Sequence, residues 1–386
     1  MKADAAIVGI AELPMGKYPD MGSLHMHAVV AERAIADAGL RKCDIDGVLT
    51  AGSRVEPFLV HAIALAELLG VETTLSATFD LGGAAHVSMV GYAGMAIANG
   101  MASNVLVVSA DNALSAFTTG GVVKMLAEIG PPHPAFERPF GPTVPSLYAL
   151  IAQRYMHEYG VKPEHLAMLN AIQRGHALLH ENAYMKKPLS VEDALAARMI
   201  ATPLRLFDCA PVCDGAGAVV VTSAERARDL ARPVVRLRGI GECNGFHHVS
   251  AAPSLTTFGG ARASRNALTQ AGVTLDDIDV AELYDCFSIT LLITMADMGF
   301  FAHGEAGGYM ESGAMNLGGR CPVNTHGGLL SHGHPGRAGG LFHMIEAVTQ
   351  LRGDAGRRQV ADAELALVHG IGGILSNHTS IVLGRG

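Results

Sequence analysis

The chain has 386 residues, of which 49% are hydrophobic and 17% charged, enough apolar material for one large core or two fused ones. Its 46 glycines and its aromatic content of only 5% indicate a compact, turn-rich fold and exclude a disordered regulator. A net charge of −8 without a stripe of lysine and arginine argues against nucleic acid as a partner.

The N-terminal part of the chain predicts buried elements of a globular protein. The run "AAIVGIAE" at residues 5–12 looks like a strand and lacks the features of a signal peptide, so we expect a cytoplasmic protein. Residues 81–110 contain no charge, but glycine, serine, asparagine and histidine interrupt them. We therefore predict a buried helix over about 84–98 and a core strand "NVLVVSA" at 104–110, and no membrane span.

An internal repeat predicts the architecture. "AIADAGLRKCDIDGV" at 34–48 and "ALTQAGVTLDDIDVA" at 267–281 share an Ala-Gly helix end, a short turn and an Asp-Ile-Asp lead into a strand. Each copy follows a strand-like run and is followed by an apolar strand with a small-residue loop, "NVLVVSADN" or "LALVHGIGG". The pattern predicts two similar α/β halves, residues 1–230 and 231–386.

A different segment separates the repeated elements, at about residues 112–211. It begins with the proline-rich "GPPHPAFERPFGP" and continues with charged helices. Long insertions in compact domains usually serve a site, so we expect an inserted cap.

Five stretches carry the most specific motifs of the chain. They are "IAQRYMHEYG", "SVEDALAARMIATPLRLFDCAPVCDGAGAVVVTS", "AELYDCFSIT", "NTHGGLLSHGHPGRAGG" and "HGIGGILSN". In order and spacing they resemble thiolases, in particular the sterol-carrier-protein-X type, and the resemblance covers the chain from end to end. It implies the α/β thiolase fold, in which duplicated βαβαβαββ halves form five layers (αβαβα), with an inserted loop or cap region.

The resemblance also implies a set of catalytic positions. In thiolases a cysteine at the start of a buried helix takes the acyl group, and a histidine in a Gly-His-Pro turn activates it. A second cysteine moves the proton at the α carbon, and an asparagine or histidine positions a water or the thioester oxygen. The Gly-His-Pro histidine corresponds to His334, the first residue of the His-Asp-Cys-Phe motif to Tyr284, and the proton-moving cysteine to His369. We expect these three residues to be catalytic acids and bases.

The position of the nucleophile is where the chain departs from the family. In the family the cysteine stands 17 residues before the glycine that corresponds to Gly100 in "AIANG", and this spacing places the nucleophile position at Gly83. Residues 80–87 contain no cysteine, serine or threonine. Gly83 and the preceding glycine fit tight packing or a left-handed turn, or else leave space for a substrate. A phosphate loop is disfavoured because no glycine-rich phosphate motif surrounds them. Candidate substrate-binding residues nearby are Gly82, His86, Asn324 and Gly372.

Three hypotheses for the function remain open. The first is aldol-type cleavage of a β-hydroxyacyl thioester, which needs a base and an acid but no acyl-enzyme. Cysteine-less family members resembling steroid side-chain aldolases share the tyrosine at the position of Tyr284, but they lack the histidine that this chain keeps at 334. The second is acyl transfer by a substitute nucleophile such as Cys286, and the third is a non-catalytic acyl-CoA-binding subunit of a hetero-oligomer.

Cofactors and partners follow from the cysteines and from the resemblance. Only Cys209 and Cys213 lie close together, without a second ligand pair, so we expect buried thiols and no metal site. No permanently bound cofactor is expected, because coenzyme A enters as part of the substrate. The resemblance implies a homodimer and, in bacteria, a small partner with an OB fold and a zinc ribbon.

Overall fold

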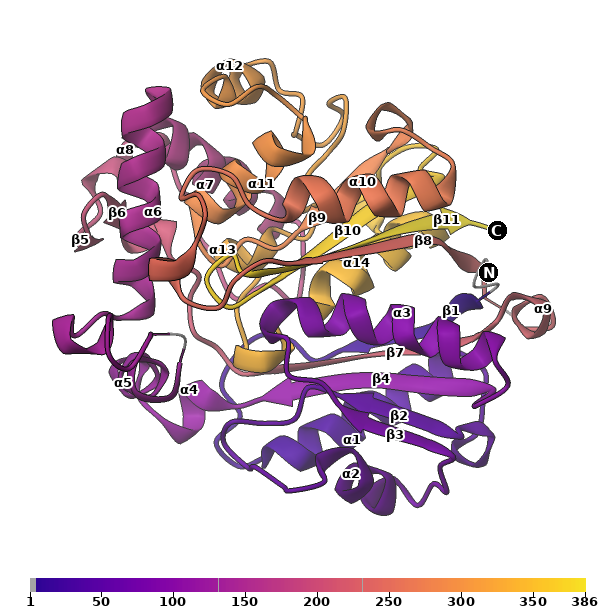
Figure 1. Ribbon diagram of the computed structural model, residues 1–386. Helices are drawn as coiled ribbons and strands as arrows, with labels where there is room; N and C mark the ends of the chain where they lie inside the picture. The colour runs from indigo at the N-terminus through magenta and orange to yellow at the C-terminus, as the bar shows by residue number, and fades with distance from the viewer. Residues whose placement is uncertain (1–4, 131, 231) are drawn as a thin grey trace.

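Nine strands form one continuous sheet in the order β3-β2-β4-β7-β1-β8-β11-β10-β9 (Figure 1). The computed structural model describes residues 5–130, 132–230 and 232–386. The nine strands are β1 (Ala5–Glu12), β2 (Gly47–Thr50), β3 (Leu75–Thr78), β4 (Asn104–Asp111), β7 (Gly215–Ser223), β8 (Val235–Asn244), β9 (Val280–Leu283), β10 (Leu365–Gly372) and β11 (Asn377–Arg385).

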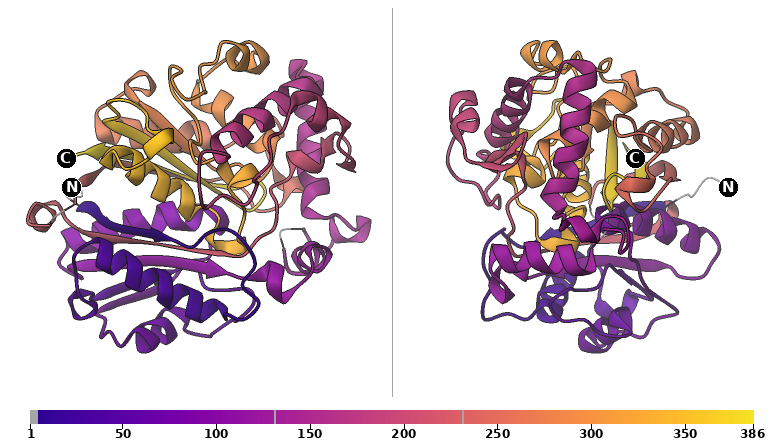
Figure 2. Two further views of the ribbon diagram at one scale, coloured as in Figure 1. Left: turned by 180° about the vertical axis from the view of Figure 1, so that it is seen from behind. Right: turned by 60° about the vertical axis from the view of Figure 1, so that its left-hand side comes forward.

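The strand pairing repeats itself in mirror order on the two sides of the β1–β8 contact. On one side β2 and β4 are parallel, and β4–β7 and β7–β1 are antiparallel. On the other side β9 and β10 are parallel, and β10–β11 and β11–β8 are antiparallel. Among the described residues, β1 and β8 pair at two positions, Ala6–Arg236 and Ile7–Val235. The two parts of the sheet therefore meet at one corner and lie over one another as separate layers (Figures 1 and 2).

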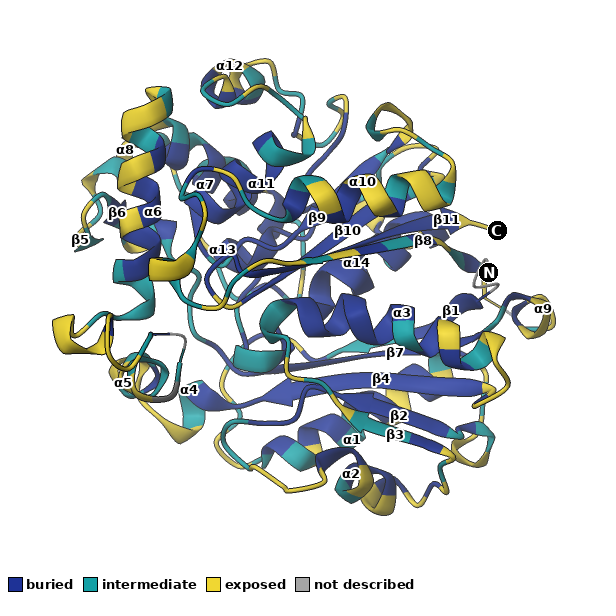
Figure 3. Cartoon of the chain, in the orientation of Figure 1, coloured by how far each residue is buried: buried dark blue, intermediate teal, exposed yellow. Residues whose placement is uncertain are grey.

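Helices cover and separate these two layers, which confirms the predicted five-layered α/β fold. The outer helices are α1 (Ser23–Asp37) and α2 (His61–Leu69) on one side and α10 (Gly260–Ala271) and α11 (Ser288–Met298) on the other. Between the two sheet layers lie α3 (Ala85–Ala98) and α14 (Leu341–Arg352), which contact strands of both layers. Because both faces of a central helix are covered, α14 is buried almost all round, whereas α1 and α10 show alternating buried and exposed faces (Figure 3).

The predicted sequence repeat is a structural repeat. A left-handed glycine follows each of the helices α1 and α10: Gly39, with φ of 70°, lies two residues after the end of α1, and Gly272, with φ of 75°, directly follows α10. Each is followed by a short 3-10 turn, η1 (Lys42–Asp44) or η6 (Leu275–Asp277), and then by β2 or β9. The last residue of each turn, Asp44 or Asp277, accepts the backbone N–H of the residue before the turn. Residue 231, where the second half was predicted to begin, lies outside the described residues, and the division at that point stays a prediction.

The residues between β4 and β7 form a long, mainly helical connection between these two neighbouring strands of the sheet. Its elements are α4 (Ala113–Ala116), α5 (Thr119–Ile129), α6 (Val144–Tyr159), α7 (Pro163–Ala177), α8 (Val191–Ala196), β5 (Met199–Ala201) and β6 (Leu204–Arg205). Helices α6 and α7 contact α11 and stand beside the two sheets (Figure 2). Its role as a cap stays a prediction.

The uncharged stretch 81–110 forms the elements predicted from it. A 3-10 turn, η2 (Gly82–Ala84), leads into α3, and β4 follows. Within the described ranges, the structure has no helix that is long and apolar enough to cross a bilayer.

Candidate active site

Three short segments meet around the start of α3. They are the end of β9 with Tyr284, the turn 332–338 with His334, and the end of β10. The parallel strands β9 and β10 end at the same sheet edge, where sites gather in α/β folds. The close backbone approach requires glycines: a Cβ on Gly340 would overlap the Gly83 carbonyl oxygen, and one on Gly370 would lie 2.9 Å from the same atom.

Tyr284 and His334 form a hydrogen-bonded pair in this place. The Tyr284 Oη and His334 Nε2 atoms are 2.9 Å apart, and in the His334 tautomer that is protonated on Nδ1 the phenol donates and Nε2 accepts. Burial raises the pKa of Tyr284 well above 10, and the neighbouring Cys286 and Asp285 raise it further. Burial lowers the pKa of His334 to about 4. At neutral pH the pair is therefore an uncharged acid beside an uncharged base.

The Tyr284 ring occupies the space beside Gly83, at the predicted nucleophile position. A Cβ on Gly83 would overlap the Cε2 and Cζ atoms of that ring and would lie 2.7 Å from the Ile371 carbonyl oxygen. The vacated position is therefore filled, and no side chain fits there while Tyr284 keeps its conformation.

Asp285 fixes the start of the segment that carries His334. Its carboxylate accepts the backbone N–H of Leu329 at 2.7 Å and of Leu330 at 3.4 Å, and the His343 Nε2 lies 3.3 Å away. At the other end of this segment, the His334 backbone N–H donates to the Pro211 carbonyl at 3.1 Å. Neither Asp285 nor His343 is among the predicted site residues, although Asp285 is part of the Tyr-Asp-Cys-Phe motif.

The side chain of His369 is engaged within the sheet instead of with the Tyr284–His334 pair. Its Nδ1 is 2.7 Å from Ser380 Oγ and its Nε2 is 3.1 Å from His378 Nδ1. Burial lowers the pKa of His369 well below 6.5. Its backbone carbonyl accepts the Tyr284 N–H at 3.0 Å.

The four candidate substrate-binding residues all lie close to this site. Asn324, with φ of 53°, uses both ends of its amide on the Leu283 backbone, accepting at 2.6 Å and donating at 2.8 Å. Gly82 and Gly372 let two backbones touch, because a Cβ on Gly82 would lie 2.9 Å from the Gly372 Cα. His86 is fully buried, and burial lowers its pKa to about 3. Asn324 thus holds the end of β9 through one amide N–H and one lone pair of its amide oxygen.

Cys286, the proposed substitute nucleophile, has a protonated and hydrogen-bonded thiol. Its Sγ–H donates to Tyr148 Oη at 3.5 Å, and that hydroxyl donates to the Gly373 carbonyl at 3.2 Å. Burial raises the pKa of Cys286 to about 12. Because the thiolate is the nucleophilic form, this environment suppresses its reactivity.

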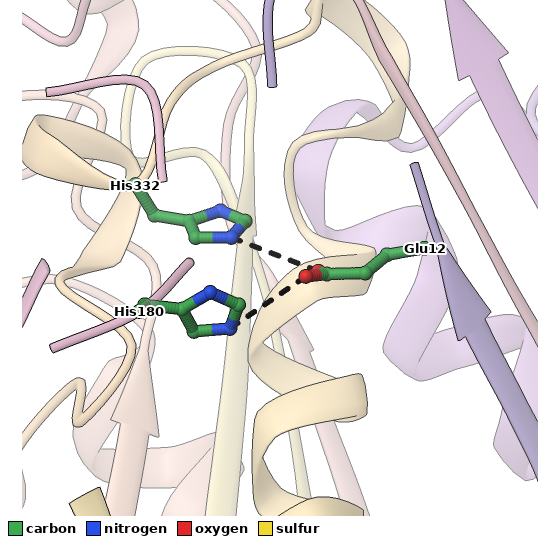
Figure 4. Close-up of side chains that lie close together, drawn as sticks. All are labelled: Glu12, His180 and His332. Carbon is green, nitrogen blue, oxygen red and sulfur yellow. Dashed lines mark ion pairs between the residues drawn. The ribbon is translucent and has the colours of Figure 1, made fainter. Parts of the chain in front are cut away.

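A second polar cluster consists of Glu12, His180 and His332 (Figure 4). The Nε2 atom of each histidine is 3.6 Å from a Glu12 carboxylate oxygen. The backbone N–H of Asn182 donates to His180 Nδ1 at 3.1 Å, so the neutral His180 ring carries its proton on Nε2 and turns it towards Glu12. A metal ligand would need a lone pair there, so this arrangement fits N–H donors around a carboxylate better than a metal site. Burial raises the pKa of Glu12, but its electrostatic interactions with His332 and His180 and its hydrogen bonds with His332 and Asn182 outweigh burial and lower the pKa to about 2.

Comparison with known proteins identifies the family. The family model "Thiolase C-terminal domain-like" matches residues 241–385. An acetyl-CoA acetyltransferase of Methanothermobacter thermautotrophicus is 34% identical over 387 residues, which cover 96% of each chain. The chain belongs to the thiolase superfamily.

Other members of the superfamily with similar chains carry lyase and aldolase names. A 17-hydroxy-3-oxo-4-pregnene-20-carboxyl-CoA lyase of Mycobacterium tuberculosis is 35% identical over 379 residues, covering 95% of this chain and 96% of that one. Among solved structures, the Ltp2-ChsH2(DUF35) aldolase is 31% identical with a TM-score of 0.88, covering 100% of this chain and 98% of that chain. The resemblance stated from the motifs is thereby confirmed.

Proposed function

We propose that this thiolase-superfamily enzyme cleaves the Cα–Cβ bond of a β-hydroxyacyl-CoA by retro-aldol chemistry, with Tyr284 and His334 as its acid/base pair. The observation that carries the proposal is the Tyr284 ring beside Gly83, hydrogen-bonded to His334 where a thiolase would hold its cysteine. A relative named as a carboxyl-CoA lyase and a structural neighbour named as an aldolase support the same class of reaction.

The pair first takes a proton from the substrate and later returns it. Tyr284 Oη accepts the proton of the substrate β-hydroxyl while its own proton passes to His334 Nε2, 2.9 Å away. The electrons of the O–H bond form the product carbonyl, and those of the Cα–Cβ bond pass to the thioester as an enolate. The pair then returns the proton to the α carbon, so atoms and charge balance without a covalent intermediate. The positive end of the α3 dipole favours the enolate oxygen.

The two alternative functions have less support in the site. Acyl transfer through Cys286 requires a thiolate, and burial raises the pKa of this thiol to about 12. A purely binding subunit does not need a neutral phenol aligned on a neutral imidazole. The geometry of Tyr284 and His334 therefore favours catalysis.

The roles of the remaining candidate residues are also proposals. Asn324 and His369 are positioning residues that hold β9 and the Tyr284 backbone. Gly82, Gly83 and Gly372 let the backbones approach, and His86 forms part of the buried wall.

The proposal also covers the cofactor, the assembly and the cellular location of the protein. Coenzyme A enters as part of the substrate, with no resident cofactor. The Ltp2-ChsH2(DUF35) name includes a second subunit, which supports a small partner protein here as well, and we propose a homodimer as the core of the assembly. A cytoplasmic location is supported by the six cysteines, all of which are free thiols.

The proposal is tested by incubating the purified protein with a series of 3-hydroxyacyl-CoA thioesters and detecting acetyl-CoA and the released aldehyde by mass spectrometry. Tyr284→Phe and His334→Ala should each lower kcat/KM by about 10²- to 10⁴-fold. Tyr159→Phe, at the end of α6, is the matched control and should retain activity. The wild-type rate should fall as the pH approaches about 4, where His334 becomes protonated and can no longer accept. No cleavage of any thioester, with or without the small partner, would contradict the proposal.

A further inference from the structure

The carboxylate of Asp285 joins the two ends of the chain segment 329–343, which carries His334. Its Oδ1 atom accepts the backbone N–H of Leu329 at 2.7 Å, at the start of this segment. The same oxygen lies 3.3 Å from Nε2 of His343, on α14, at the end of the segment. One buried oxygen atom therefore closes a loop within which His334 lies.

This carboxylate is also packed tightly against the turn that leads to His334. Gly328 has a left-handed φ of 61°, and a Cβ on this residue would overlap Asp285 Oδ2. Asp285 directly follows Tyr284 in the chain, and Asp285 and His343 are both fully buried. A movement of the carboxylate would therefore shift the loop of His334 relative to Tyr284.

The hydrogen bonds around Asp285 are those of an ionised carboxylate. The backbone N–H groups of Leu329 and Leu330 both donate to it. His343 Nδ1 has no hydrogen-bond partner among the described residues, so a neutral His343 gains a hydrogen bond to Asp285 in the tautomer with the proton on Nε2. Burial raises the pKa of Asp285, and His343 and the two backbone N–H groups oppose this increase.

Other titratable side chains interact electrostatically with Asp285 or His343. Besides Tyr284 and Cys286, they are Glu282, His86, His326, His334 and His369. Burial lowers the pKa of each of these four histidines, so they are neutral at neutral pH, and burial raises the pKa of Glu282. None of these groups supplies a positive charge, so the N–H donors stabilise the charge of Asp285.

We propose that Asp285 and His343 are positioning residues that set the distance between Tyr284 and His334. The Nε2–H group of His343 keeps the Asp285 carboxylate ionised, and the carboxylate holds both ends of the loop that carries His334. This inference rests on the proposed function, because it concerns the same site. A misplacement of about 1 Å can lower the rate of a reaction by about 10²-fold, so the alignment of the pair is worth holding.

Substitutions of His343 separate its hydrogen bond from its packing. His343→Leu removes the N–H donor and should lower kcat for the cleavage of a 3-hydroxyacyl-CoA by about 10²-fold, with KM within a few-fold of the wild type. His343→Gln keeps an N–H donor and should recover most of kcat. Thr349→Val, further along α14, is the matched control and should leave kcat unchanged, because this hydroxyl donates to the Ile345 carbonyl. Equal losses in the Leu and Gln variants, or no loss in either, would contradict the proposal.

The pH dependence of kcat distinguishes the charge of Asp285 from its packing. Without the His343 donor the pKa of Asp285 should rise, so the carboxyl keeps a proton to higher pH and is a poorer acceptor for the two backbone N–H groups. Raising the pH removes this proton, so kcat of His343→Leu should increase with pH in the neutral range, where the wild type is constant. Asp285→Asn cannot ionise, and its loss of kcat should be the same at every pH. A loss in His343→Leu that does not depend on pH would overturn the role of the charge.

NMR of nitrogen-labelled histidines measures the alignment of the pair without any substrate. The His334 signals are identified by their loss in His334→Gln, and Tyr284→Phe gives the Nε2 signal without the phenol. His343→Leu and Asp285→Asn should move the His334 Nε2 signal towards that reference, whereas His343→Gln should leave it near the wild-type position.

The two measurements distinguish this inference from the proposed function. If the His334 signal moves as expected but the wild type cleaves no thioester, the proposed function is wrong and the positioning role stands. If the wild type cleaves its substrate but the signal and kcat are unchanged in His343→Leu, the positioning role is wrong and the reaction type stands.

Discussion

Gly83 and Tyr284 form a matched pair, because the ring of one fills the space that a side chain on the other would need. A side chain at position 83 and the Tyr284 ring in its present place therefore exclude one another. With Tyr284 in place, a substitution at position 83 alone brings a new side chain into the aromatic ring, and the close-packed interior leaves the ring little room to move.

A pair of variants tests this coupling. Gly83→Cys alone should lower the melting temperature, because overpacking costs about 1–3 kcal/mol, and should displace Tyr284 and abolish cleavage. Adding Tyr284→His removes the overlap with the ring but leaves the close approach to the Ile371 carbonyl oxygen, so the double variant should recover part of the lost stability, and its new thiol should react with iodoacetamide. Calorimetry and labelling followed by mass spectrometry measure both effects. A single variant as stable and active as the wild type would show that the ring does not fill this space in solution.

Strands β10 and β11 are joined by side-chain hydrogen bonds as well as by their backbones. His378 Nε2–H donates to the Leu375 carbonyl at 3.0 Å, which leaves Nδ1 to accept from His369 Nε2–H at 3.1 Å. The His369 Nδ1 then accepts from Ser380 Oγ–H at 2.7 Å. Each tautomer is fixed by the next group, so His369 has no free lone pair to accept a substrate proton.

Replacing His369 should therefore affect stability more than chemistry. His369→Ala leaves two buried polar groups without partners and should cost about 2–5 kcal/mol in the free energy of unfolding, with kcat of the folded protein within a few-fold of the wild type. Ser380→Ala removes one of the same hydrogen bonds without touching an imidazole and should cost about 1 kcal/mol. Denaturant titration and steady-state kinetics separate the two effects. A loss of kcat above about 100-fold at unchanged stability would restore the catalytic role that the motif implied.

These elements also show what the sequence predicts and what it does not. The repeat and the apolar runs predict the layers, because burial alternates with the period of each helix and strand. Motif spacing places Tyr284 and His334 in one site. The direction of the His369 side chain depends on its partner Ser380 across β11, a register that no local pattern encodes.

At the scale of the whole molecule, the terminal strand β3 forms an open edge of the sheet. Strand β3 is the terminal strand beside β2, so one side of its backbone is unpaired within the described sheet. The neighbouring Met101, whose carbonyl accepts from Thr74 just before β3, is 51% exposed, and Leu68 at the end of α2 is 50% exposed. An open edge with apolar side chains beside it favours association, and a second copy meeting it about a twofold axis closes both edges at once.

This arrangement leads to a prediction about the mass in solution. The protein of 40.2 kDa should sediment as a dimer of about 80 kDa. Met101→Glu places a charge beside the edge of β3 and should shift the equilibrium towards the monomer, because a buried unpaired charge costs several kcal/mol. Leu150→Glu makes the same kind of change at a 55% exposed position on α6, far along the chain from this edge, and should leave the dimer intact. A wild-type monomer, or equal dissociation in both variants, would place the self-association surface elsewhere or remove it.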